Sequence, residues 1–274
     1  MQIAVTGGSG ELGSTLIPYL VEQGHAVVSL DRTLPPSNAP RPVQARYMIA
    51  DTRNFGDVVA GFQGCEAVIH LAAHRSPFGA PDSVVYGDNT LGSYNALAAA
   101  AALGIQWVCL ASSINAIGGG FSRSPRYDYF PIDEQHPTYA EDPYSLSKWV
   151  LEQQAGACAR RHEGMTIASL RFHWLVENRA RAVALTTGPG SAGHLWGYVV
   201  RREASRACLL ALTAGFKGHE AVYIVAPRTS AAEASLDLAR QSYPDTPVRG
   251  DLSDHKGFYN CAKAERLLSW RHEE

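Results

Sequence analysis

The amino-acid sequence predicts an α/β protein built on a doubly wound parallel sheet. Short apolar runs alternate with helix-length segments through the first half of the chain, which is the pattern of a sheet with crossover helices. Several runs are apolar throughout, as is typical of strands that are covered on both faces. A glycine-rich turn also separates the first run from the first helical segment. Together these observations favour parallel strands with helices on both sides of the sheet.

The elements of the first half follow in a regular order. The expected strands are Ile3–Val5, Ala26–Leu30, Gln44–Ile49, Ala67–Leu71 and Trp107–Ala111. The expected helices are Leu12–Gln23, Phe55–Phe62 and Val84–Leu103. Residues 33–42 contain four prolines, so we expect a loop there.

The second half is less regular. Gly118–Asp142 is rich in Gly, Pro, Ser and Tyr, which indicates a functional loop. The expected elements after it are a helix over Tyr144–His162, a strand over Thr166–Phe172, a helix near Arg201–Ala214, a strand over Ala221–Val225 and a closing helix near Ala262–Trp270. No linker divides the chain. We therefore expect residues 1–274 to form a single domain, to which the chain from about residue 172 onward adds a small substrate lobe.

Composition narrows the function classes. Hydrophobic residues make up 46% and charged residues 18% of the chain, which suits a globular protein with a sizeable core. The 24 basic and 26 acidic side chains nearly cancel, so no charge pattern favours nucleic acid or an anionic membrane. The five cysteines and ten histidines show neither disulfide nor zinc-ligand spacing. We expect a cytoplasmic protein, without a metal, whose partner is a small molecule.

The glycine-rich turn predicts a dinucleotide site. Glycines allow a tight turn and close approach to a pyrophosphate, and the helix that follows offers free N–H groups. Asp31 ends the second strand 18 residues after Gly13, where a carboxylate accepts both ribose hydroxyls of NAD. The residues of this turn that we expect at the cofactor are Gly7, Gly10, Glu11, Leu12 and Gly13.

Two neighbouring positions bear on the choice of cofactor. Arg32 could hold the 2′-phosphate of NADP or be a solvated surface residue, while Asp31 would repel that phosphate. NAD is therefore favoured, with NADP as the alternative. Asp51 follows the third expected strand, where it would accept a hydrogen bond from the adenine amino group or cap the helix after it. The sequence leaves both roles open.

Tyr144 and Lys148 are the candidate catalytic pair. Residues i and i+4 share a helix face, so the phenol and the ammonium point the same way. A tyrosine with the reference pKa of about 10 is a poor base, and a nearby ammonium is expected to lower that pKa. Tyr144 would then exchange a proton with a substrate hydroxyl or carbonyl while hydride moves to or from the cofactor.

Polar residues on two other elements complete the candidate site. Ser112 and Ser113 end the fifth expected strand, where a hydroxyl could hold the reacting oxygen or form a turn. Asn89 lies in the preceding helix. It is either a structural polar residue or the anchor of a water in a proton path.

In combination these residues resemble the extended short-chain dehydrogenase/reductase family, also called the NAD-dependent epimerase/dehydratase family. The similarity covers the glycine turn, Asp31, Asp51, Leu71-Ala72-Ala73, Asn89-Thr90-Leu91-Gly92, Ser112-Ser113 and Pro143-Tyr144-Ser145-Leu146-Ser147-Lys148, and it resumes at Lys263–Trp270. The resemblance implies a Rossmann-type fold with Ser113, Tyr144 and Lys148 as the catalytic triad, and it places Leu71, Ala72 and Ala73 along the cofactor. We also expect the cofactor to contact Thr52, Asn89, Ala111, Tyr144 and Lys148, and the substrate to contact His74, Ser113, Asn115 and His173.

The subfamily is harder to predict. Dehydratases of this family place an acidic pair after the catalytic hydroxyl residue, whereas Ser113 is followed by Ile114 and Asn115. Nucleotide-sugar epimerases have a larger C-terminal lobe than the 126 residues that follow Lys148. The compact length and the Ala111–Gly118 run are similar to those of uronate dehydrogenases, but their substrate-contacting residues after the serines are not kept.

These comparisons favour an oxidoreductase that moves hydride between NAD(P) and a hydroxyl or carbonyl of a small polar, sugar-like substrate. An epimerase with tightly held NAD is the alternative, and a non-catalytic sensor is disfavoured because Tyr144 and Lys148 are both present. A homodimer is left open. The loop over Gly118–Asp142 is expected to close over the pocket, and its aromatic residues would either cover a sugar ring or pack the loop down: Phe121, Tyr127, Tyr129 and Phe130.

Overall fold

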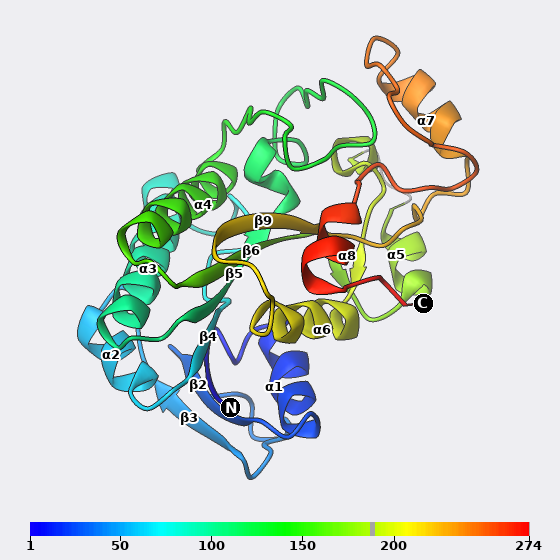
Figure 1. The fold of residues 1–274 in the computed structure, drawn as a ribbon. Coiled ribbons are helices and arrows are strands. Elements are labelled where there is room, and N and C mark those ends of the chain that lie inside the picture. The colour runs from blue at the N-terminus through cyan, green and yellow to red at the C-terminus, as the bar shows by residue number, and fades with distance from the viewer. Residues whose placement is uncertain (187–189, 274) are drawn as a thin grey trace.

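The computed structural model describes residues 1–186 and 190–273. Its main sheet has seven parallel strands in the order β3-β2-β1-β4-β5-β6-β9 (Figure 1). The order reverses between β1 and β4, and this reversal creates a crevice at the carboxyl ends of the strands. The strands are β1 Gln2–Thr6, β2 Ala26–Asp31, β3 Ala45–Ile49, β4 Ala67–His70, β5 Trp107–Ser113, β6 Thr166–Phe172 and β9 Gly218–Ile224.

Helices cover both faces of this sheet (Figure 1). Ile3 and Val5 of β1 pack on one side, and Ala4 between them packs on the other, because successive side chains of a strand point to opposite faces. Both faces are therefore apolar, which confirms the predicted doubly wound class. The first face is covered by α1 Gly13–Glu22, α6 Arg201–Ala211 and α8 Ala262–Leu268; the second by α2 Phe55–Phe62, α3 Asp82–Ala102 and α4 Pro143–Arg161.

The C-terminal part of the chain contributes to the sheet and also forms a separate cluster. Phe130 and Phe258 are fully buried at the centre of this cluster, which also includes Tyr223 of β9. Three short elements contribute to it: η1 Ile114–Ile117, η2 Ser191–His194 and α7 Ser235–Ser242. Three others belong to a smaller apolar cluster: β7 Leu175–Val176, α5 Arg179–Leu185 and β8 Val199–Val200. The elements β7, β8, α5 and α7 were not predicted from the sequence.

The predicted loop over residues 118–142 contains no long element, but much of it is not free to move as a lid. Phe130 and Ile132 are fully buried. The Phe130 N–H donates to the Pro247 carbonyl at 3.0 Å, and the Ile132 N–H donates to the Phe258 carbonyl at 2.7 Å. The prediction of a lid along the whole loop is therefore wrong, because its middle is bonded to the C-terminal cluster.

The two longest helices, α3 and α4, carry polar or small residues at many of their positions. Across the described ranges, no helix combines the length and the apolar character that a membrane crossing requires.

Candidate active site

A cleft of about 850 Å³ runs along the carboxyl ends of the strands. Asp31, the last residue of β2, and Asp51, which follows β3, line one end. Trp174, which follows β6, and His194, which belongs to η2, line the other end. The cleft therefore crosses the point where the strand order reverses, and it is long enough to serve an extended ligand together with a second, smaller one.

The glycine turn is packed so closely that side chains are excluded from it. A Cβ on Gly7 would lie 2.7 Å from the Ala72 nitrogen, and one on Gly13 would lie 2.5 Å from the Gly8 carbonyl oxygen. Gly7 also has a φ of +71°, which favours glycine. The turn consequently presents the free N–H groups at the start of α1 to the cleft, as binding of a pyrophosphate requires. Every glycine-turn residue predicted for the cofactor lines the cleft: Gly7, Gly10, Glu11, Leu12 and Gly13.

We expect Gly7→Ala to weaken dinucleotide binding far more than Gly24→Ala. Gly24 has a φ of +82° but no neighbour within 4 Å of an added Cβ. Both variants bear the left-handed backbone cost of roughly 1–2 kcal/mol, but only Gly7→Ala displaces the backbone of Ala72. Calorimetric titration of NAD and thermal unfolding of both variants check this. Equal losses of NAD affinity would show that the close approach at Gly7 is unimportant.

Asp31 stands at the expected ribose position. Its carboxylate accepts hydrogen bonds from the Ser9 N–H at 3.0 Å and the Thr33 N–H at 3.3 Å, so the glycine turn fixes its orientation. Carboxylate oxygens keep further lone pairs for ligand hydroxyls. The turn, Asp31 and the Leu71-Ala72-Ala73 segment all line the same cleft, and these residues fit a dinucleotide.

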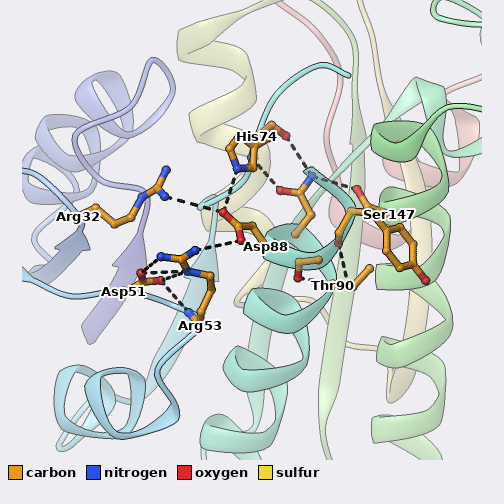
Figure 2. Close-up of polar contacts among 10 residues, drawn as sticks. Arg32, Asp51, Arg53, His74, Asp88, Thr90 and Ser147 are labelled. Carbon is orange, nitrogen blue, oxygen red and sulfur yellow. Dashed lines mark hydrogen bonds and ion pairs between the residues drawn. The ribbon is translucent and has the colours of Figure 1, made fainter. Parts of the chain in front are cut away.

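Charged side chains gather at the end of the cleft where the adenosine of the cofactor is expected (Figure 2). Arg53 donates from Nε to both Asp51 oxygens at 3.0 Å, and this pairing is the main reason why the pKa of Asp51 is lowered. Asp88 accepts from Arg53 at 3.2 Å and lies 3.9 Å from Arg32. The His74 ring also contacts Asp88, at 3.0 Å, so its imidazole faces this charged cluster.

The residue that caps α2 decides between the two roles predicted for Asp51. Asn54 is the N-cap of that helix, and its side chain accepts from the Gly56 N–H at 2.9 Å. The capping role predicted as one alternative for Asp51 is therefore wrong. Asp51 and Thr52 instead line the cleft, where Asp51 remains available to an adenine amino group only if it shares its oxygens with Arg53.

Asn89 connects three segments of the chain by hydrogen bonds. Its Oδ1 accepts from the His74 N–H at 2.7 Å, and its Nδ2 donates to the His74 carbonyl at 3.2 Å and to Ser147 Oγ at 2.9 Å. Ser147 Oγ in turn donates to the Tyr144 carbonyl at 2.7 Å. With both amide donors engaged, Asn89 links α3 and the segment after β4 to α4, and this favours the structural alternative.

Tyr144 and Lys148 lie in the first turns of α4, which starts at a well-capped end. Asp142 Oδ1 accepts from the Ser145 N–H at 2.9 Å, and Pro143 takes the first helical position, as is common. Lys148 Nζ donates to the Ala111 carbonyl at 2.7 Å and lies 5.7 Å from the centre of the Tyr144 ring. Ser113, Tyr144 and Lys148 all line the cleft, so the structure brings the predicted triad together.

Burial dominates the electrostatics of this triad. It raises the pKa of Tyr144, against the opposing effect of the neighbouring Ser113 hydroxyl. It lowers the pKa of Lys148 to about 8, against the opposing charge of Glu152. The expectation that the ammonium lowers the tyrosine pKa is therefore wrong for the chain on its own, because burial of both groups outweighs their proximity.

Ser112 serves a different purpose from Ser113. Its hydroxyl donates to Glu152 Oε1 at 2.6 Å, and Glu152 forms a two-pronged ion pair with Arg171 at 2.9 and 2.8 Å. Arg171 also donates to the Tyr223 hydroxyl at 3.1 Å. This buried network ties α4 to β5, β6 and β9 directly beneath Lys148, which lies one helical turn from Glu152.

The substrate end of the cleft combines predicted and unpredicted residues. Asn115 lines the cleft, and its Oδ1 accepts from the Gly120 N–H at 3.0 Å. The His173 ring also reaches the cleft, but Nδ1 accepts from the Trp174 N–H at 2.6 Å and Nε2 contacts the His194 carbonyl at 2.7 Å. Both ring nitrogens of His173 are thus held by backbone groups.

Three aromatic residues at this end were not among the predicted contacts: Phe78, Trp174 and His194. Phe78 and Trp174 are exposed at 73% and 45%. An exposed aromatic residue leaves no signal in a sequence pattern, and His194 reaches the cleft only through the path of the C-terminal lobe. Of the four loop aromatics, Phe121 alone lines the cleft, while Tyr127 and Phe130 are buried in the C-terminal cluster.

Comparison with known proteins agrees with this geometry. A model of the NAD dependent epimerase/dehydratase family matches residues 3–213. The L-arabinose 1-dehydrogenase (NAD(P)(+)) of Haloferax volcanii is 28% identical over 181 residues, which cover 64% of this chain and 67% of that protein. The chain spans about half the length of other curated relatives that it matches.

Solved structures show the same fold over the whole chain. The UDP-glucose 4-epimerase of Thermotoga maritima superposes with a TM-score of 0.74 at 21% identity, covering 100% of this chain and 94% of that one. A mutated uronate dehydrogenase gives a TM-score of 0.68 at 19% identity, covering 100% and 82%. Because the family model matches most of the chain and the glycine turn, Asp31 and the triad share one cleft, the chain belongs to the NAD dependent epimerase/dehydratase family.

Proposed function

We propose that this chain is an NAD-dependent oxidoreductase that moves a hydride between the nicotinamide and a hydroxyl or carbonyl of a small polar, sugar-like substrate. The observation that carries this proposal is the position of Ser113, Tyr144 and Lys148 in the same cleft as the glycine turn. Family membership and relatives such as the arabinose dehydrogenase support it. Tightly held NAD in an epimerase is the alternative, since an epimerase is among the structures with the same fold.

Each side chain of the triad has a different role in proton transfer. With its raised pKa, the Tyr144 phenol keeps its proton at neutral pH and can donate it to a carbonyl oxygen. Ser113 Oγ lies beside that phenol and would hold the same oxygen by a hydrogen bond. Lys148, fixed on the Ala111 carbonyl, supplies positive charge while it is protonated, below a pH of about 8. When bound, NAD accepts or supplies the hydride.

Incubation of the purified chain with NAD and a panel of sugars, uronates and small alcohols tests the proposal. The absorbance of reduced cofactor is followed while the products are separated. Stoichiometric NADH with any member of the panel supports net oxidation. Conversion of a UDP-sugar to its epimer without accumulation of NADH would replace the oxidoreductase with the epimerase.

The residues at the expected ribose position, Asp31 and Arg32, lead to a separate prediction about the choice between NAD and NADP. We expect the chain to bind NAD more tightly than NADP, because the Asp31 carboxylate repels a 2′-phosphate. Asp31→Ala should narrow or reverse this preference, since Arg32 also lines the cleft and can then bind the 2′-phosphate without an opposing carboxylate. Titration of both dinucleotides into both proteins measures the effect. A wild-type preference for NADP would mean that Arg32 outweighs Asp31.

The proposal also covers the domain organisation and the location of the protein. The chain forms one domain with a substrate lobe from about residue 172, because β9, which lies in this C-terminal part, is a strand of the main sheet. The protein acts in the cytoplasm, where its five cysteines stay as thiols.

The same proposal includes a homodimer. It forms through α3 and α4, which lie side by side (Figure 1) and expose Leu91, Tyr94 and Leu146. Light scattering tests the dimer.

A further inference from the structure

An aromatic wall stands beside Tyr144 at the substrate end of the cleft. We define it as Phe78, Phe121, Trp174 and His194. The Phe121 ring centre lies 5.7 Å from that of Tyr144 and 5.7 Å from that of His194, with both pairs edge to face. Phe78 packs on Phe121 at 5.8 Å, and Trp174 stacks on His194 at 6.3 Å. Separate parts of the chain thus build one continuous wall next to the catalytic phenol.

Two polar side chains meet at the inner end of this wall. A Cβ on Gly120 would lie 2.2 Å from the His194 ring and 3.0 Å from Asn115 Oδ1, so the absence of a side chain at Gly120 lets them approach. Asn115 Oδ1 is used by the Gly120 N–H. Within the described residues, Asn115 Nδ2 and the His194 ring nitrogens have no hydrogen-bond partner, although both residues line the cleft.

The polar groups of this corner are neutral. Burial lowers the pKa of His194, so its imidazole is uncharged at neutral pH and has one donor and one acceptor nitrogen. The positive charge of Arg75, which lies outside this corner, acts to lower the pKa of Tyr144. However, Arg75 is ion-paired with Glu11. A substrate carboxylate placed here would lose its water without gaining a free cation, whereas a hydroxyl would find a donor and an acceptor.

We propose, on the basis of the oxidoreductase function above, that this corner binds a neutral, hydroxyl-bearing ring. Asn115 Nδ2 and the His194 imidazole hydrogen-bond hydroxyls next to the reacting carbon, and the aromatic wall covers one apolar face of the ring. Pockets of this kind use many apolar contacts and a few polar groups to fix orientation. The chain therefore selects a cyclic neutral sugar over the matching uronate and over the open-chain polyol.

Two substitutions at His194 separate its hydrogen bonds from its ring. His194→Phe keeps an aromatic ring without nitrogens, and His194→Gln keeps hydrogen bonding without the ring. His255→Phe is the matched control, because His255 lies outside the cleft and contacts the Glu233 carbonyl. Each protein is loaded with NADH, and binding of an aldopyranose, its uronate and its open-chain polyol is measured by saturation-transfer NMR. In separate assays NAD replaces NADH as the hydride acceptor, and KM and kcat are measured for any member that turns over.

We expect wild type to bind the aldopyranose best, and His194→Phe to weaken this binding about five- to tenfold, the value of one or two net hydrogen bonds. His194→Gln should retain more affinity than His194→Phe, and NADH affinity should not change in either. Tighter binding of the uronate, or an unchanged affinity in His194→Phe, would overturn the inference. If the sugar binds as expected but no hydride is transferred, the proposed sugar site is supported and the oxidoreductase function is rejected. If His194→Phe turns over the sugar with an unchanged KM, the oxidoreductase function is supported and the proposed sugar site is rejected.

Discussion

Replacing Tyr144 with phenylalanine should lower kcat by roughly 10²–10⁴, which is the contribution of one positioned acid/base group. The expected result rests on the place of the phenol in the cleft beside Ser113. The Tyr144 backbone also accepts from Ser147, and this contact survives the substitution. NAD affinity should therefore stay near that of wild type. Steady-state kinetics and calorimetric NAD titration measure the two quantities.

Tyr94→Phe is the control for this substitution. Tyr94 is 56% exposed on α3, so loss of its hydroxyl should leave kcat unchanged. A Tyr144→Phe protein that retained more than about a tenth of the wild-type kcat would remove Tyr144 from its acid/base role.

The second large effect concerns stability. Glu152→Gln should lower the free energy of unfolding by about 3–5 kcal/mol, because it leaves the Arg171 guanidinium buried without its counter-charge. Glu152 and Arg171 are 4% and 7% exposed, so water cannot replace the lost partner. Chemical denaturation of the variant and the wild type measures the difference.

Two further proteins make this stability test specific. The double variant Glu152→Leu with Arg171→Met removes both charges and should be more stable than Glu152→Gln, since no lone charge remains buried. Glu22→Gln breaks the exposed pair with Arg202 and should cost at most about 1 kcal/mol. If Glu152→Gln costs no more than Glu22→Gln, the buried network does not stabilise α4 against the sheet.

The cofactor half of the protein could be predicted closely from the sequence, because its signals are local. The glycine turn, Asp31 and the first five strands each depend on a few consecutive residues, and they occur where predicted. The same holds for Tyr144 and Lys148, whose shared helix face follows from their spacing. Local patterns of this kind fix the order of elements and therefore the edge of the sheet where side chains meet.

The substrate half could not be predicted in this way, because its contacts depend on the path of the chain. His194 reaches Phe121 only because η2 and the loop after η1 pack together. The pairing of Ser112 with Glu152, and of Asp51 with Arg53, likewise decides which candidate side chains remain free for a ligand. The sequence shows that these polar residues lie near the site, but it does not show which partners already hold them.

The fate of the transferred hydrogen tests the central claim most directly. A cyclic sugar deuterated at the reacting carbon is incubated with the chain and excess NAD, and deuterium is followed by NMR in the sugar and in the free cofactor. Net hydride transfer from the sugar to NAD, with Tyr144 as the acid/base group, predicts that wild type moves deuterium from the sugar into released NADH. Tyr144→Phe should do so roughly 10²–10⁴ times more slowly. Return of the deuterium to the same sugar carbon with inverted configuration, and none in free NADH, would contradict the oxidoreductase and establish the epimerase.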